Sequence, residues 1–146
     1  MPPDVSEITA LYQQAAGEDR EAADFLGAVN AYFNGWDDLA DDPESSFAAK
    51  MRLGILASVL FSCPFYQRHT GALRLVVFLV TNAFAESVEW ANRPEAWRRE
   101  AARVLRYAGN DMVLAVAYIT SNGNYDFCHK LSEQLRACSV KAHEHH

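Results

Sequence analysis

The side chains best suited to chemistry gather in one short run, Asn34-Gly35-Trp36-Asp37-Asp38-Leu39-Ala40-Asp41-Asp42-Pro43. Residues four apart share one face of a helix, so Asp37 and Asp41 can bind one divalent cation, with Asn34 one turn earlier on that face. Without a cation or a basic partner, carboxylates placed in this way repel each other and oppose the helix dipole. The run therefore predicts a cation site, in which Asp38 is a third candidate ligand.

A second polar face follows the most apolar stretch of the chain. Asn82, Glu86 and Glu89 fall on one helical face, in line with apolar residues that precede them. Asn82 and Glu86 are candidates for a second metal-binding wall, and Glu89 is a candidate ligand-binding residue. Further along the chain, a polar stripe is either a solvated face paired with glutamates or a surface that grips a phosphate opposite the metal site. This stripe consists of Arg99, Arg103, Arg106, Tyr107 and Asn110, and its candidate ligand-binding residues are Arg103, Arg106 and Asn110.

Composition limits the functions that are open to the chain. It has 146 residues, half of them hydrophobic, and a formal net charge of −6 at pH 7. This length fits one core and one domain, and the acidic balance disfavours binding to nucleic acid. Three cysteines without CxxC spacing predict neither a disulfide framework nor a structural zinc site. The apolar stretch 72–85 is short for a membrane span and no signal sequence opens the chain, so we expect a cytoplasmic protein without a membrane partner.

Helical periodicity runs through the whole chain and must position these side chains. A serine at 45 or 46 can cap a helix that continues to residue 63, and Pro43 can end the helix before it. The segment 72–85 lacks a polar arc and is predicted to be the central, most buried element. No strand is required, so the expected fold is an all-α antiparallel bundle of five to six helices, one domain over 1–140 with a mobile tail at 141–146. The other predicted helices cover residues 5–16, 19–41, 71–92, 94–121 and 125–139, with a short turn or helix at 64–69.

Asp37, Asp38 and Asp41 form the pattern D-D-x-x-D. In this pattern the chain resembles the trans-isoprenoid synthases, all-α enzymes in which such a motif holds magnesium ions that grip a diphosphate, opposite a second metal-binding motif. The resemblance implies an isoprenoid-synthase-like bundle, Mg²⁺ as cofactor and a phosphorylated ligand. Asn82 and Glu86 match the first step of the second motif, and the chain is much shorter than those enzymes. We therefore expect a truncated relative without the catalysis of that family.

Two further resemblances concern short motifs. The run 36–41 and the later turn Cys63-Pro64-Phe65-Tyr66 are similar to small uncharacterised proteins of bacteriophages and prophages, which implies a phage-encoded protein in a bacterial cytoplasm. Glu86 and Glu89, with Asp111 on the next predicted helix, resemble the metal-binding residues of the all-α nucleoside triphosphate pyrophosphohydrolases. Ala108 stands where that family has another glutamate.

Three functions follow from these patterns. The first is a non-catalytic module that binds a phosphorylated small molecule, with Mg²⁺ at the aspartate cluster. The second is a metal-dependent enzyme that acts on a prenyl or nucleotide diphosphate, although no residue is assigned a catalytic role. The third is an interaction protein whose helical faces form a homo-oligomer or bind a host component.

Overall fold

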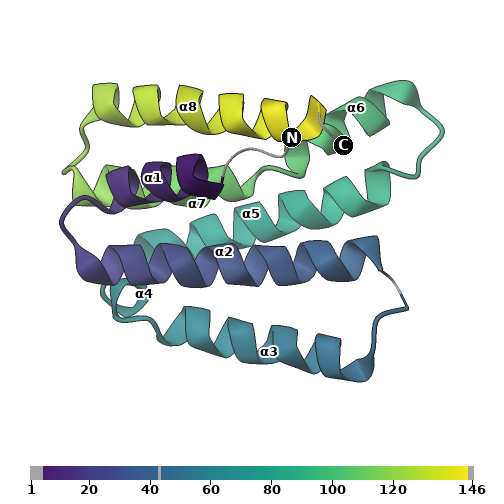
Figure 1. Cartoon of the computed structure of the whole chain (residues 1–146), viewed down its shortest axis with the longest axis horizontal. Coiled ribbons are helices and arrows are strands. Elements are labelled where there is room, and N and C mark those ends of the chain that lie inside the picture. The colour runs from purple at the N-terminus through teal and green to yellow at the C-terminus, as the bar shows by residue number, and fades with distance from the viewer. Residues whose placement is uncertain (1–4, 43, 145–146) are drawn as a thin grey trace.

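The computed structural model describes residues 5–42 and 44–144, and these ranges contain helices and turns but no strand (Figure 1). The predicted all-α class is confirmed. The described residues form seven helices of ten or more residues and one short helix, so the predicted count of five to six was too low. They are α1 (Val5–Ala16), α2 (Arg20–Asp41), α3 (Phe47–Ser62), α4 (Pro64–Arg68), α5 (Thr70–Trp90), α6 (Ala96–Leu105), α7 (Gly109–Thr120) and α8 (Tyr125–Glu144).

Local sequence signals explain several helix boundaries. The Asp19 carboxylate accepts a hydrogen bond from the Ala22 N–H at the start of α2, and the Ser46 hydroxyl accepts one from the Ala49 N–H at the start of α3. Pro64 occupies the first turn of α4, where its missing N–H costs no helical hydrogen bond. Helix α2 ends at Asp41 as predicted, but Pro43 lies outside the described residues. Helix α8 runs on to residue 144, so it includes part of the predicted tail, and residues 145–146 are outside the described ranges.

The helix predicted over 94–121 is in fact two helices. Arg106, Tyr107 and Ala108 form a turn between α6 and α7, in which the Tyr107 and Ala108 N–H groups bond to carbonyls three residues back. Gly109, a poor helix former, begins α7. Because α6 packs on α5 while α7 packs on α1 and α8 as well, the break lets each helix follow its own neighbours.

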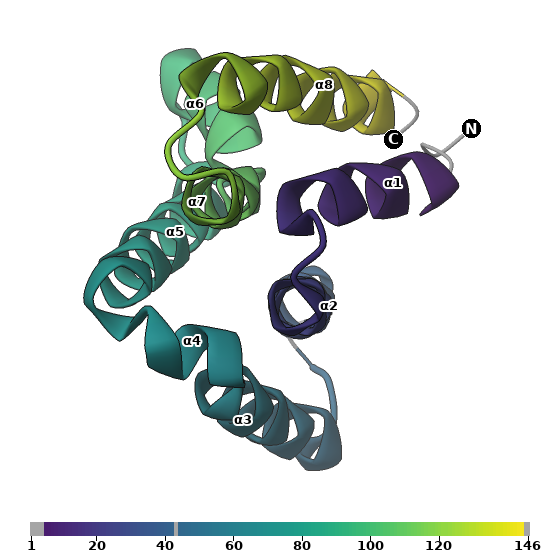
Figure 2. The ribbon, with the colours of Figure 1, turned by 90° about the vertical axis from the view of Figure 1, so that its left-hand side faces the viewer.

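The centre of the core is α7 and not the 72–85 segment. Met112, Val113 and Val116 on α7 are fully buried, and Figure 2 shows α7 lying among α1, α5 and α8. Helix α5 buries Leu73 and Val80, but more of its apolar side chains are exposed than buried. The prediction that 72–85 is the most buried element is therefore wrong: a helix that is apolar all round need not be surrounded by its own chain.

Helix α5 is also relevant to whether the chain contains a segment that could cross a membrane. Over Thr70–Trp90 it is long and apolar enough, by length and composition alone, to cross a membrane, and 22% of its most apolar window is buried inside the molecule. This helix extends beyond the stretch 72–85 on which the sequence-based exclusion rested.

Candidate functional site

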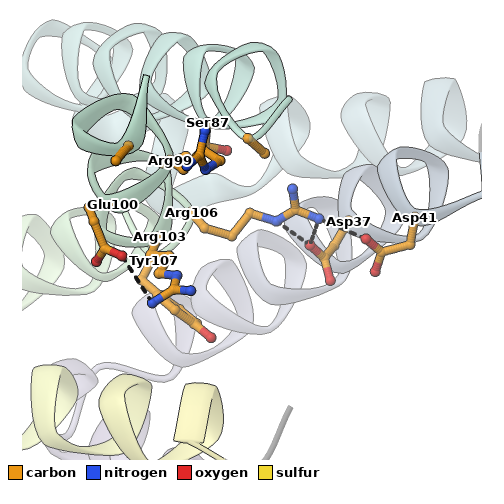
Figure 3. A pocket seen from close by; sticks show the side chains of 11 residues that line it. Asp37, Asp41, Ser87, Arg99, Glu100, Arg103, Arg106 and Tyr107 are labelled. Carbon is orange, nitrogen blue, oxygen red and sulfur yellow. Dashed lines mark hydrogen bonds and ion pairs between the residues drawn. The ribbon is translucent and has the colours of Figure 1, made fainter. Parts of the chain in front are cut away.

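Helices α2, α5 and α6 enclose a pocket of about 660 Å³, which we call the α2–α6 pocket (Figure 3). One wall is the end of α2, and the opposite wall is α6 with the turn that follows it. The pocket is lined by Asp37, Asp41, Ser87, Ala91, Ala96, Arg99, Glu100, Ala102, Arg103, Arg106 and Tyr107.

Arg106 joins the two walls of this pocket. Its Nε and Nη2 atoms each lie 2.7 Å from Oδ1 of Asp37, and Nη2 also lies 3.0 Å from Oδ1 of Asp41. In Figure 3 the guanidinium of Arg106 points toward both carboxylates, and dashed lines join it to each of them. The predicted pairing of Asp37 and Asp41 on one helical face is thus realised, and a basic partner from another helix offsets their repulsion.

The break between α6 and α7 explains how Arg106 reaches α2. Arg106 is the C-cap residue of α6, where the chain leaves the helix. Its Cζ lies 4.9 Å from the centroid of the Phe84 ring on α5, a cation–π contact that fixes the side chain from one side. The Arg106 side chain is 25% exposed, whereas Asp37 and Asp41 are 45% and 70% exposed. The arginine is therefore the most enclosed member of this cluster.

Two further arginines line the same pocket. Arg103 Nη1 lies 3.3 Å from a carboxylate oxygen of Glu100, one turn earlier on α6. Arg99 Nη1 donates to the main-chain oxygens of Arg93 and Pro94, and no carboxylate within the described residues forms an ion pair with it. The pocket therefore holds three guanidinium groups against three carboxylates.

Tyr107 adds a phenol to the same lining. Burial raises the pKa of Tyr107, the Asp37 carboxylate raises it further, and Arg106 lowers it in part. The phenol is accordingly a hydrogen-bond donor at neutral pH.

The structure does not bring the two predicted metal-binding walls into one cavity. Asp38 lines a separate cavity of about 780 Å³ between α2 and α3. Asn82 Nδ2 donates to Glu86 Oε1 at 3.1 Å, and neither residue lines the α2–α6 pocket; nor does Glu89, which is exposed. Over residues 5–42 and 44–144, no group of three or more His, Cys, Asp or Glu side chains could hold a metal ion.

The two predicted amide residues lie next to the pocket. Asn34 and Asn110 line a cavity of about 170 Å³ that also contacts Asp37 and Arg106. The Asn110 side chain donates to the Ser139 hydroxyl at 2.8 Å, so it ties α7 to α8.

Four polar residues that line the pocket were not among the candidate metal-binding or ligand-binding residues: Ser87, Arg99, Glu100 and Tyr107. Arg99 and Tyr107 belong to the polar stripe already recognised in the sequence, and Glu100 could have been found from its position three residues before Arg103, the spacing of helical neighbours. Ser87 gave no such signal: it is buried, and its hydroxyl donates to the Phe84 carbonyl within its own helix.

Comparison with family models, with curated proteins and with solved structures gives no match to this chain.

Proposed function

We propose that the α2–α6 pocket binds a phosphorylated small molecule and that the protein is a binding module. The observation that carries this proposal is the convergence of Arg99, Arg103 and Arg106 on one cavity. Guanidinium groups form paired, charge-assisted hydrogen bonds with phosphate oxygens, which makes arginine the usual residue for recognising phosphate. A volume of about 660 Å³ suits a small ligand and not a macromolecule.

Arg99 and Arg103 are the side chains best able to accept a ligand. Arg99 donates only to main-chain oxygens among its described partners, so a phosphate there meets no competing carboxylate on that side chain. Arg103 is 57% exposed and holds a single contact with Glu100, a type of surface ion pair that contributes little free energy. Both can therefore change partner at low cost.

Magnesium fits this proposal as a companion of the phosphate. Mg²⁺ in proteins is commonly held by one or two carboxylates together with phosphate oxygens and water. Asp37 and Asp41 are the residues that would hold it, because an oxygen of each lies within 3.0 Å of the same Arg106 nitrogen. Since Arg106 occupies those oxygens, we expect the ion to bind only with a phosphate that takes over the hydrogen bonds of Arg106. The magnesium ion would neutralise part of the phosphate charge.

The test is isothermal titration of the protein with inorganic pyrophosphate, with and without millimolar magnesium. We expect binding in the presence of magnesium, weakened at least about tenfold by Arg103→Gln and by Arg99→Gln, since a charge-assisted pair contributes roughly 1.5 to 3 kcal/mol. Arg136→Gln is the matched control, because Arg136 is exposed on α8 and lies outside the pocket. Magnesium titrated alone should give no heat of specific binding.

Three outcomes would count against the proposal or change it. No binding at millimolar pyrophosphate overturns it, and so does binding that the two pocket variants leave intact. Binding that ignores magnesium removes Asp37 and Asp41 as ion ligands. Release of inorganic phosphate during the titration, measured colorimetrically, would instead favour the enzyme alternative over a binding module.

A further inference from the structure

Large apolar side chains lie on the surface of α3 and α5, away from the α2–α6 pocket. Each is between 51% and 76% exposed, and nothing in residues 5–42 and 44–144 covers it. Monomeric soluble proteins rarely expose large apolar patches, and where they do, the surface usually serves association. We call this set the apolar outer face: Phe47, Met51, Ile55 and Val59 on α3, and Leu75, Phe78 and Leu79 on α5.

The apolar outer face is opposite to the sides that build the core. Helix α3 buries Leu53 and Leu60, and α2 is its main neighbour. Helix α5 buries Leu73 and Val80, and it packs on α6 and α7. Figure 2 shows α3, α4 and α5 as a continuous outer border of the molecule. Because residues half a turn from a buried stripe cannot reach the same core, most of the surface of these side chains is left uncovered within the described fold.

The apolar outer face has the size of a protein interface. Its seven side chains leave on the order of 100 Å² each in contact with solvent, or roughly 700 Å² together, given that a large aromatic side chain buries about 150 to 250 Å² in full. A standard stable interface buries about 800 Å² per partner. The exposed area of these side chains is therefore close to that of one side of such an interface.

The charges beside this face are complementary between the two helices. Within α3 the charged residues are Lys50 and Arg52, both in its first half; Arg52 lines the cavity between α2 and α3, so Lys50 is the basic group available to the apolar outer face. The acidic residues of α5 are Glu86 and Glu89, both in its second half, and its basic residue, Arg74, lies in its first half, whereas the second half of α3 carries no charge. Since α3 begins and α5 ends at the same end of the molecule (Figure 1), Lys50 and the two glutamates lie at matching heights. This arrangement is the one that a pairing of α3 with α5 from another copy requires.

We propose that the occupant of the apolar outer face is a second copy of this chain, in a two-fold symmetric dimer. The axis runs along the helices, so that α3 of each copy lies antiparallel to α5 of the other. The apolar stripes face each other, and Lys50 of one copy lies opposite Glu86 and Glu89 of the other. An anionic membrane is the poorer occupant, because the chain carries a net charge of −6.

Sedimentation equilibrium from about 10 nM to 100 µM, with fluorescence detection at the lower concentrations, tests this dimer, because interfaces of standard size have dissociation constants of micromolar and below. Ile55→Glu and Phe78→Glu should each raise the dissociation constant at least about 100-fold, since a two-fold axis places each substitution in the interface twice. Val104→Glu is the matched control: Val104 is 68% exposed on α6 and lies outside the face, so this variant should stay dimeric. Circular dichroism melts of all three variants check that they remain folded.

Charge-reversal substitutions provide a second, independent test of the dimer. Lys50→Glu and Glu89→Lys should each weaken the dimer by about threefold to tenfold, as expected for two rim ion pairs per dimer, and the double variant should recover most of the loss. This pattern of loss and rescue does not arise from a change in folding.

Four results would overturn the dimer. A monomer at all concentrations is the first, and a dimer that Ile55→Glu and Phe78→Glu leave unchanged is the second. The third is a monomer that sediments with phosphatidylglycerol vesicles and is released by these two substitutions, since the occupant would then be a membrane. The fourth is a double charge variant that is weaker than both single variants. None of these results bears on pyrophosphate binding in the α2–α6 pocket.

Discussion

Replacing Arg106 with glutamine should destabilise the protein by about 1 to 2 kcal/mol. The substitution removes two ion pairs, to Asp37 and to Asp41, and the cation–π contact with Phe84. Exposed ion pairs contribute roughly 0.2 to 1 kcal/mol each, and the pair with Asp41, which is 70% exposed, belongs at the lower end. The contact with Phe84 adds about 0.5 to 1 kcal/mol. For a domain of this size, the melting temperature should fall by about 3 to 6 °C.

The double change Asp37→Asn with Asp41→Asn decides between two accounts of the acidic cluster. If the carboxylates only repel each other, removing their charges should raise the melting temperature slightly, by relieving like-charge and helix-dipole terms of about 0.3 to 1 kcal/mol each. Because Arg106 is only 25% exposed and is held by both carboxylates, we expect the opposite sign, a loss of about 1 kcal/mol.

Urea unfolding in magnesium-free buffer, with a double-mutant cycle between Arg106→Gln and Asp37→Asn, measures both quantities. The coupling energy should be about 0.5 to 1 kcal/mol and should shrink in about 1 M salt, because these groups are partly exposed. A double aspartate variant that is more stable than the wild type, or a coupling energy of zero, would refute the description of Arg106 as the link between α2 and α6.

Three other perturbations have expected outcomes. Asp19→Ala removes the cap of the first turn of α2 and should lower stability by about 1 kcal/mol in urea unfolding; an unchanged midpoint would mean that the cap contributes nothing. Gly123→Ala should cost at least about 1 kcal/mol, since Gly123 has a φ of +77° and a Cβ there would lie 3.3 Å from the Tyr118 ring, and a stabilised variant would contradict this. Burial and a nearby aspartate raise the pKa of Cys63, so at pH 8 iodoacetamide should alkylate it more slowly than it alkylates a cysteine in an unfolded peptide; equal rates would show a normal thiol.

The helix boundaries that could be predicted from sequence are those set by local chemistry. Asp19, Ser46 and Pro64 act on the residues beside them, so their roles were visible in the chain itself. The turn at 106–108 was not visible, because no proline marks it and its cause is tertiary: α6 and α7 pack on different neighbours. The helices on either side of that turn therefore appeared as one.

Tertiary contacts also decide the α2–α6 pocket and the apolar outer face, and the sequence does not show them. Asp37 and Asp41 could be paired by their spacing, but their contact with Arg106 joins residues more than sixty positions apart and follows no local pattern. Apolar periodicity likewise says that α3 and α5 need apolar surroundings, but it does not say whether their own chain provides them. The exposure of Ile55 and Phe78 had to come from the structure.

The packing of α1 has a consequence for the order in which the chain folds. Its main neighbours besides α2 are α7 and α8, and the Thr120 hydroxyl on α7 donates to the Ala15 carbonyl at 2.6 Å across more than a hundred residues. During synthesis from the N-terminus, α1 and the adjoining side of α2 therefore stay unpacked against α7 and α8 until nearly all of the chain has emerged. Helices α2 and α3 can pair early, since they are neighbours in sequence and in space. The last helices to be made thus complete the core, and a ribosome-bound fragment that ends before residue 109 should leave α1 open to proteases.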